Sequence, residues 1–295
     1  MHTSPPAAAF RRPDLHCHSV FSDGTQTPEA LADMARSNGV DLWALTDHDT
    51  VDGIALARAA AREAGIAFLS GVEISVSLMN ETVHIVGLGV DENHPGLLTG
   101  LAHIRHDRLA RAQRMADGLA EAGIPGAFDG AMQYVRNPDL VSRAHFARWL
   151  VAQGVCRHTQ EVFGRYLTPG KPGYVPHVWA TLQDALGWIA DSGGIAVLAH
   201  PGRYRYDALQ REQLHEQFTA LGGQAVEVVT GSHRSSDVAF YARVAQERGL
   251  LASHGSDFHD PHESKIHLGQ CPDMPEGLTP VWTRLQERIQ RPALH

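Results

Sequence analysis

Short apolar runs alternate with helical patterns in the first and last thirds of the chain. Runs typical of buried strands lie at 40–46, 66–70, 82–88, 195–201, 225–229 and 250–259. Between them, apolar positions at helical spacing predict helices at about 28–38, 52–64, 207–221 and 235–248. Thr27 and Pro28 form a typical start of the first helix, and Gly39 a typical end. This alternation predicts an α/β protein with a parallel sheet, open or closed into a barrel.

The segment from about 91 to 184 has a different pattern, with helical stretches, loops and few strand signals. We expect one long helix from Leu97 to Ala122, ended by Gly123, and short helices at 142–152 and 159–166. The chain is therefore expected to comprise a flexible tail (1–13), a barrel (14–90 and 185–295) and an inserted, mainly helical cap domain (91–184).

Composition excludes some classes of protein. The 295 residues are 43% hydrophobic and 20% charged, as in ordinary globular domains. A net charge of −8 argues against a nucleic-acid coat or a basic membrane-binding surface. The only lysines are Lys171 and Lys265, so we expect arginine to make most cationic contacts.

Compartment is predicted from the cysteines and from the apolar runs. Cys17, Cys156 and Cys271 are far apart and form no CxxC pair, which indicates a reducing compartment. No apolar run approaches the roughly 20 residues of a membrane span, and residues 1–13 hold no core of a signal peptide. We expect a cytoplasmic protein without a membrane anchor or an obligate protein partner.

The stretch DLHCHSVFSDG, which begins at Asp14, is the most informative in the chain. Residues i and i+2 of a strand face the same side, so His16 and His18 can present both imidazoles to one ion. Asp23, past the strand end, can reach a neighbouring ion. Other His and carboxylate residues recur at strand ends or within a short strand, and strand ends carry the chemistry of parallel α/β folds. The candidate metal ligands are His16, His18, Asp23, His48, Glu73, His84, His200, Asp257 and His259.

These nine residues favour a metal site over the alternative of unrelated surface histidines. The chain has 19 histidines, and the set combines imidazoles and carboxylates without thiolates. Such a mixture suits Mn, Fe or Zn in a hydrolytic site. Nine ligands are too many for one ion, and a carboxylate such as Glu73 can bridge two.

Six motifs in order, DLHCHSVFSDG, LTDHDT, GVEIS, VHIVGL, LAHPGR and HGSDFH, resemble those of the PHP (polymerase and histidinol phosphatase) family. The resemblance covers about 14–90 and 190–260. It implies a distorted (β/α)7 barrel with phosphoesterase activity and three divalent metal ions, Mn being the first choice and Fe or Zn the alternatives. Within LTDHDT, we expect Asp47 and Asp49 to orient His48 or shape the turn rather than bind metal.

The resemblance also implies how the ligands divide among the ions. The first ion would be bound by the residues expected to form the catalytic group around an attacking water: His16, His18, Glu73 and Asp257. The second would be bound by Glu73, His84 and His200. The third would be bound by Asp23, His48 and His259. The family often has His where this chain has Asp23, which keeps an acceptable oxygen ligand.

Two stretches of the intervening segment, VSRAHFAR (141–148) and GKPGYVP (170–176), resemble the inserted domain of one bacterial branch of the family. Enzymes of that branch dephosphorylate nucleoside 3′,5′-bisphosphates and trim short RNA from its 5′ end. The branch usually has Pro where this chain has Ala144. A bisphosphate needs a second anion site away from the metals, for which Arg and Lys are suited. The candidate substrate-binding residues are Ser142, Arg143, His145, Lys171, Tyr174, Arg203 and His233.

The main interpretation is a phosphatase that removes the 3′-phosphate from nucleoside 3′,5′-bisphosphates, for example converting adenosine 3′,5′-bisphosphate to AMP and phosphate. No Ser, Cys or Asp nucleophile stands in a known phosphoenzyme context, so direct attack by water is expected. A 5′→3′ exoribonuclease on short RNA is an alternative. A metal-dependent amidohydrolase and a non-catalytic metal-binding module are further alternatives. The four arginines at 105, 108, 111 and 114 are expected to form a solvated helix face.

Overall fold

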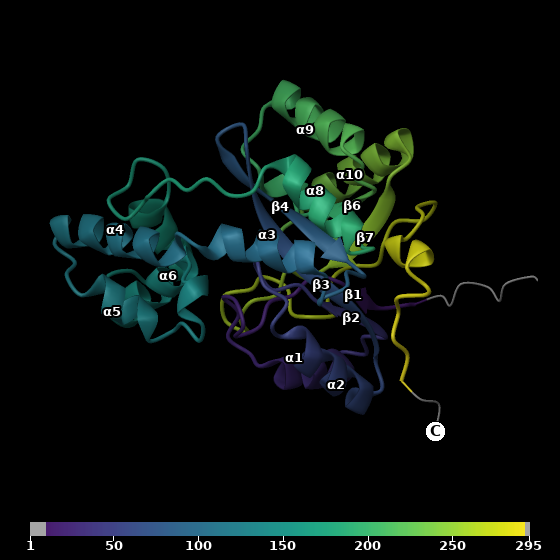
Figure 1. The fold of residues 1–295 in the computed structure, drawn as a ribbon, viewed down its shortest axis with the longest axis horizontal. Helices are drawn as coiled ribbons and strands as arrows, with labels where there is room; N and C mark the ends of the chain where they lie inside the picture. Colours follow the sequence, from purple (N-terminus) through teal and green to yellow (C-terminus); the bar gives the residue numbers. More distant parts are fainter. Residues whose placement is uncertain (1–9, 293–295) are drawn as a thin grey trace, which may run out of the picture.

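The computed structural model describes residues 10–292, which form a nearly closed seven-stranded barrel with helices around it (Figure 1). The strands pair in chain order: β1 (Pro13–Asp14), β2 (Leu42–Leu45), β3 (Ala67–Leu78), β4 (Glu81–Leu88), β5 (Ile195–Leu198), β6 (Ala225–Thr230) and β7 (Leu251–Gly255). Across the seam, the Leu15 amide donates to the His254 carbonyl, and Cys17 pairs with Phe258. The predicted distorted (β/α)7 barrel is confirmed.

The strand β4 is the main departure from the expected parallel sheet. It runs antiparallel to both β3 and β5, whereas the other pairs are parallel. Met79 and Asn80 join β3 to β4 with φ angles of 48° and 63°, as a tight two-residue hairpin requires. Because β4 is reversed, its first half lies where the other strands end. The predicted parallel sheet was therefore wrong for β4.

Two hydrophobic layers hold the barrel. One face of the strands packs against the helices through side chains such as Trp43, Phe68 and Ile85. The alternate face fills the interior with Leu42, Leu69, Val86 and Val197, together with side chains from the C-terminal segment 281–289. The covering helices are α1 (Pro28–Ser37), α2 (Ile54–Ala64), α3 (Pro95–Arg105), α8 (Leu182–Asp191), α9 (Ala208–Ala220) and α10 (Ser235–Arg248).

A second group of helices projects from the barrel, at the left of Figure 1, and is called here the helical lobe. It contains α4 (Arg108–Glu121), α5 (Ala127–Met132), α6 (Arg143–Ala152) and α7 (Thr159–Val162), with short helical turns η1 (Pro138–Leu140) and η2 (Phe163–Leu167). Its hydrophobic core is separate from that of the barrel and includes Met115, Leu119, Phe146 and Leu150.

The predicted long helix 97–122 is wrong, because the chain breaks at His106–Asp107 into α3 and α4. Leu97, Leu101 and Ile104 belong to the barrel core, whereas the apolar side chains of α4 belong to the lobe core. One continuous apolar stripe in the sequence thus serves two separate cores. The domain boundaries at 91 and 184 stay a prediction, but the lobe core begins only at Ala112 and extends to Leu167.

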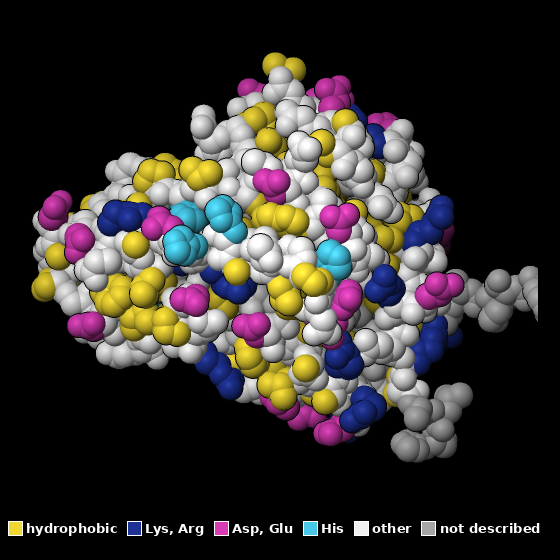
Figure 2. Space-filling view, viewed as in Figure 1, with side chains coloured by type: hydrophobic (Ala, Val, Ile, Leu, Met, Phe, Trp, Pro, Cys, Tyr) yellow, Lys and Arg dark blue, Asp and Glu magenta, His cyan; other side chains and the backbone are white. Residues whose placement is uncertain are grey.

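Two expectations concern the surface and the tail. Among residues 10–292, no helix is long and apolar enough to cross a membrane. On the face in Figure 2, basic and acidic side chains alternate without a continuous basic patch, as the net charge predicts. Most of the predicted tail, residues 1–9, lies outside the described residues. The amides of Arg11 and Arg12 donate to the Asp41 carboxylate, so the end of that segment is held against the barrel.

Candidate active site

The predicted ligands converge at one end of the barrel from loops and strands far apart in the sequence. His16 and His18 follow the short β1, rather than lying on a strand as expected, and their Nε2 atoms are 3.2 Å apart. Glu73 is central in β3, and His84 lies in the first half of the reversed β4. His200 and Asp257 each come two residues after a strand, β5 and β7 respectively.

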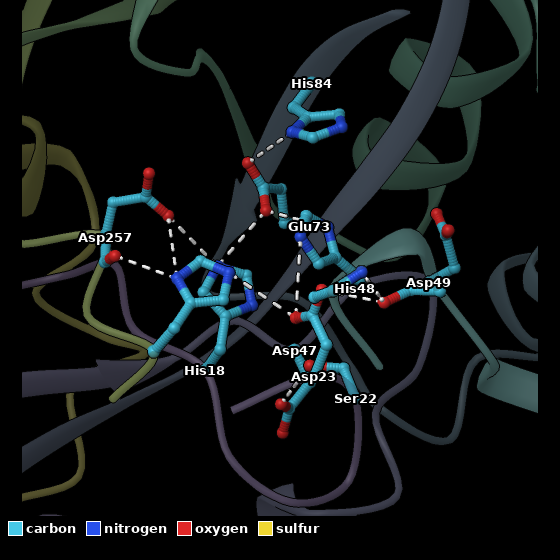
Figure 3. A network of polar contacts seen from close by, with 12 residues as sticks. His18, Ser22, Asp23, Asp47, His48, Asp49, Glu73, His84 and Asp257 are labelled. Atoms are coloured by element: carbon cyan, nitrogen blue, oxygen red, sulfur yellow. Dashed lines mark hydrogen bonds and ion pairs between the residues drawn. The ribbon is translucent and has the colours of Figure 1, made fainter. Parts of the chain in front are cut away.

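Glu73 lies at the centre of the cluster (Figure 3). Its Oε1 is 3.3 Å from His16 Nε2, 3.0 Å from His84 Nδ1 and 2.9 Å from His200 Nε2. Its Oε2 is 3.3 Å from His18 Nε2 and 2.9 Å from His48 Nδ1. A carboxylate surrounded by five imidazoles is suited to bridge ions, as the sequence predicts.

Three overlapping groups each place their donor atoms within 4.8 Å of one another. The first is His16, His18, Glu73 and Asp257. The second is His48, Glu73 and His84, and the third is His18, Asp23, His48 and His259. All nine predicted ligands therefore lie together, because His200 contacts Glu73. The three groups differ from the predicted division of ligands among the ions at His48. Its Nδ1 faces Glu73, and its Nε2 lies 3.8 Å from Asp23 Oδ1, so His48 belongs to two groups.

The donor set fits divalent metal ions. Buried polar atoms usually have hydrogen-bond partners, yet Asp23 Oδ1, His48 Nδ1, Glu73 Oε2 and His84 Nδ1 have none in the described residues. Leaving such nitrogens and oxygens buried without partners is costly, and a bound cation would satisfy them. Imidazole nitrogens and carboxylate oxygens are ligands of Mn, Fe and Zn.

The carboxylates of the cluster and one of its histidines have pKa shifts that suit cation binding. Burial raises the pKa of Glu73, but the imidazoles of His84, His48 and His16 outweigh burial and hold this pKa well below its usual range. Burial also raises the pKa of Asp23, and His48 and His259 likewise outweigh it. Burial lowers the pKa of His84 to about 4, so this imidazole is neutral near pH 7 with a lone pair for a metal.

Glu227 on β6 was not identified as a site residue from the sequence. Its Oε1 is 2.7 Å from His16 Nδ1, and its Oε2 accepts from the His200 amide at 2.6 Å. One carboxylate thus orients His16 and fixes the backbone at His200, as carboxylates behind metal-binding histidines do. The available signal was a lone acid within the apolar run Ala225–Val229.

Asp47 and Asp49 shape turns, as expected, and neither belongs to the three groups. Asp47 accepts from the Ser19 amide at 2.7 Å and from the Ser19 and Ser22 hydroxyls at 2.6 Å. Asp49 accepts from the Ser75 amide and hydroxyl and pairs with Arg108. Non-glycine residues are rare at positive φ, and three at this site adopt it: Asp49, His200 and Asp257, at 51°, 28° and 54°.

A pocket of about 720 Å³ lies between the cluster and the helical lobe. Of the predicted substrate-binding residues, Ser142, Arg143 and Arg203 line it. Four others do not line it: His145, Lys171, Tyr174 and His233. Arg203 Nη1 donates to Asp257 Oδ2 at 2.7 Å.

The two predicted histidines have other structural contacts. His145 is buried, and its Nδ1 accepts from the Ser142 amide at the start of α6. The ring of His233 stacks on Tyr241, its Nε2 accepts from the Gly202 amide, and its Nδ1 lies 3.0 Å from the Val228 carbonyl. Both ring nitrogens of His233 are therefore occupied, which leaves it no free group for proton transfer to a substrate.

The arginines of α4 are not a solvated face, and that prediction is wrong for Arg108 and Arg111. Both are 5% exposed and line the pocket. Arg108 pairs with Asp49 and lies over the Trp179 ring. Burial, with the nearby Arg143 and Arg108, lowers the pKa of Arg111 to about 10. Within residues 10–292, neither Arg111 nor Arg143 has a carboxylate partner.

Comparisons with known proteins agree with this geometry. A family model of the PHP domain matches residues 14–168. The chain is 51% identical to the 3′,5′-nucleoside bisphosphate phosphatase of Chromobacterium violaceum, over 95% of this chain and 98% of that protein. It is 42% identical to the 5′-3′ exoribonuclease Rnm of Escherichia coli, over 91% of this chain and 92% of that protein.

A solved structure shows the same fold. It is that of an amidohydrolase from Chromobacterium violaceum with bound sulfate and no metal, 51% identical to this chain. It superposes with a TM-score of 0.93 over 96% of this chain and 98% of that one. The chain therefore belongs to the PHP domain family.

Proposed function

We propose that the protein is a metal-dependent phosphatase that removes the 3′-phosphate from nucleoside 3′,5′-bisphosphates, with adenosine 3′,5′-bisphosphate giving AMP and phosphate. The observation that carries the proposal is one pocket that is lined both by the ligand cluster and by arginines. One wall is the ligand cluster around Glu73, and the other holds Arg111 and Arg143, which have no carboxylate partner among residues 10–292. A substrate with two phosphates can satisfy both walls. The relative from Chromobacterium violaceum, whose name states this activity, supports the choice.

Three divalent ions, with Mn as first choice, are proposed to occupy the cluster. His16, His18, Glu73 and Asp257 would hold the first, Glu73, His84 and His200 the second, and Asp23, His48 and His259 the third. When bound, such ions polarise phosphoryl oxygens and activate water. The buried lone pairs without partners at Asp23, His48, Glu73 and His84 support this occupancy.

The protein's own residues bind and orient the substrate. Arg111 and Arg143 would form charged hydrogen bonds to the 5′-phosphate, since guanidinium groups match phosphate geometry. Arg203, at the edge of the pocket beside Asp257, would contact the 3′-phosphate. Holding the 5′-phosphate away from the cluster leaves the 3′-phosphate as the reacting group, an effect of orientation on rate.

A second candidate is a 5′→3′ exoribonuclease on short RNA. The identity of 42% to the Escherichia coli exoribonuclease favours it. The two activities differ in whether a chain can extend from the pocket beyond one nucleotide.

A phosphate-release and product assay with Mn separates these activities. Protein is incubated with adenosine 3′,5′-bisphosphate, or with a 5′-phosphorylated RNA of four nucleotides. The phosphatase proposal predicts rapid phosphate release from the bisphosphate and slower or no shortening of the RNA. Rapid shortening of RNA with little release from the bisphosphate would support the exoribonuclease instead.

A further inference from the structure

The ligands of the predicted third ion, Asp23, His48 and His259, all lie outside the seven strands, although His48 forms an isolated bridge with Glu73. Asp23 is in the loop after β1, His48 follows β2, and His259 follows β7. Of the other predicted ligands, Glu73 and His84 lie in β3 and β4, and Glu227 of β6 holds His16. Loops need further contacts to fix their side chains to within the tolerance of a metal site.

Arg148 of the lobe helix α6 joins two of these loops. It is 8% exposed, and its Nη1 donates to the Asp23 carbonyl at 2.6 Å. Its Nε and Nη2 donate to the Glu263 carboxylate at 3.1 Å and 3.0 Å. Because the guanidinium is planar and binds the Asp23 carbonyl and the Glu263 carboxylate together, it fixes these two groups relative to each other more closely than a lysine could.

The Glu263 side of this clamp leads to His259. The next residue, Ser264, accepts from the His259 amide through its hydroxyl at 2.9 Å. The Glu263 amide donates to Asp260 Oδ1, and the Thr25 hydroxyl donates to Asp260 Oδ2 at 2.6 Å. Arg148 therefore fixes the loop of His259 against the loop of Asp23.

The start of α6 directs the carboxylate of Asp23. The Ser142 hydroxyl donates to Asp23 Oδ2 at 3.2 Å. Oδ1, which has no hydrogen-bond partner in the described part of the chain, then faces His259 Nε2 at 3.4 Å and His48 Nε2 at 3.8 Å. The helix thus fixes one oxygen of the Asp23 carboxylate and leaves the other oxygen able to bind a metal ion.

The loop of His48 is held from the connection between α3 and α4. Arg105 Nη1 donates to the Asp49 carbonyl at 2.6 Å, and Arg108 pairs with the Asp49 carboxylate. Asp49 follows His48 directly and has a φ of 51°, so its backbone needs such contacts. Residues between 105 and 148 therefore contact all three loops, and the His48 loop is also paired with Glu73 of β3.

We propose that Arg148 is a positioning residue that makes the third ion depend on the docked helical lobe, while the ions around Glu73 depend on the barrel. This inference rests on the three-ion part of the proposed function. Docking of the lobe tightens binding of the third ion, and by linkage that ion stabilises the docked lobe. Loss of a contact behind a metal ligand typically weakens metal binding about 10- to 100-fold.

The test is a count of bound Mn, independent of enzymatic activity. Chelator-stripped protein is dialysed against graded Mn and its content measured by elemental analysis. Wild type is expected to reach three ions per chain. Arg148→Ala should retain two tight ions, with the third weakened about 10- to 100-fold and restored by excess Mn.

Matched variants separate positioning from folding. Glu263→Gln keeps the size of its side chain, and it should weaken the same single ion. Arg165→Ala, which removes an exposed pair with Glu161 in the same lobe, should retain three tight ions. Thermal unfolding of each variant checks the fold.

Three outcomes would overturn the inference: three tight ions in Arg148→Ala and Glu263→Gln, equal weakening of all ions in them, or fewer than three ions in wild type. The phosphatase proposal would then still stand or fall on phosphate release, which this experiment does not measure.

Discussion

The two walls of the pocket differ in chemistry and in how they are built. The barrel wall gathers carboxylates and imidazoles around Glu73, fixed by strands and by Glu227. The lobe wall gathers arginines, of which Arg148 and Arg108 are tied to carboxylates, whereas Arg111 and Arg143 are not. From this difference we propose a division of roles: the barrel wall would bind cations, Arg148 and Arg108 would fix loops, and Arg111 and Arg143 would bind an anion. The predictions below test this division.

The largest effect is expected at the centre of the barrel wall. Glu73→Gln removes a negative charge that two of the three donor groups share; only the group around Asp23 does not include Glu73. We expect loss of at least the two ions nearest Glu73 and a fall in kcat of roughly 10³-fold or more, because several kcal/mol of transition-state stabilisation are lost. Elemental analysis and phosphate release measure both effects. Full metal content in this variant would remove Glu73 from its bridging role.

The counterpart of Arg148 on the barrel wall is Glu227. Glu227→Gln weakens the orientation of His16 and the contact with the His200 amide. Binding of the ions near Glu73 should weaken about 10- to 100-fold, while the third ion stays tight. Mn titration followed by elemental analysis checks this. If Glu227→Gln and Arg148→Ala affected the same ion, the two walls would not hold separate ions.

A smaller effect is expected from replacing Arg111 or Arg143, the two arginines of the lobe wall that are not tied to carboxylates. Arg143→Ala and Arg111→Ala should each raise KM for a 3′,5′-bisphosphate by roughly 10- to 100-fold, since a charged hydrogen bond contributes about 1.5–3 kcal/mol. The fall in kcat should be smaller than the rise in KM, because among residues 10–292 neither arginine forms a hydrogen bond with the ligand cluster. Arg114→Ala, on the same helix but paired with Asp107 at the surface, is the control. An unchanged KM would mean that the phosphate away from the ions binds elsewhere.

The smallest effect is expected from removing the capping side chain at the start of a helix, and two such helices can be compared. Ser142 and Thr181 cap α6 and α8 through their side-chain oxygens. Ser142→Ala and Thr181→Ala should each lower the free energy of unfolding by about 1 kcal/mol. Only Ser142→Ala should also weaken the third ion, about fivefold, since it loses the contact with Asp23. Denaturant unfolding and Mn titration separate the effects, and equal Mn affinity in both variants would argue against a role for Ser142.

The barrel wall could be predicted from the sequence because its ligands lie next to strands. HxH after β1, the acid after β7 and the histidine after β5 occupy positions that the topology brings together, and the structure does bring all nine candidates together. The reversal of β4 was missed, because a tight turn at Met79–Asn80 has no Gly or Pro to mark it. His84 nevertheless lies in the cluster. It is in the first half of β4, and because β4 runs antiparallel, that half lies where the neighbouring strands end.

The lobe wall could not be predicted in the same way. Arg108 and Arg111 occur in a helical stretch rich in arginine, and periodicity alone could not show that the helix breaks at His106–Asp107 and brings both side chains to the pocket. Glu227 and Arg148 act on partners far away in the sequence. Their contacts depend on packing between elements, which local patterns do not specify.

The central claim is that the pocket binds one phosphate at the ligand cluster and the other at Arg111 and Arg143. It is tested most directly by identifying which phosphate leaves. Adenosine 3′,5′-bisphosphate and adenosine 3′-monophosphate are compared with Mn, and the products are separated by chromatography. We predict AMP with its 5′-phosphate as product, and a much higher kcat/KM for the bisphosphate because the remote phosphate orients the reacting group. Release of the 5′-phosphate, or equal kcat/KM for the two substrates, would contradict this claim.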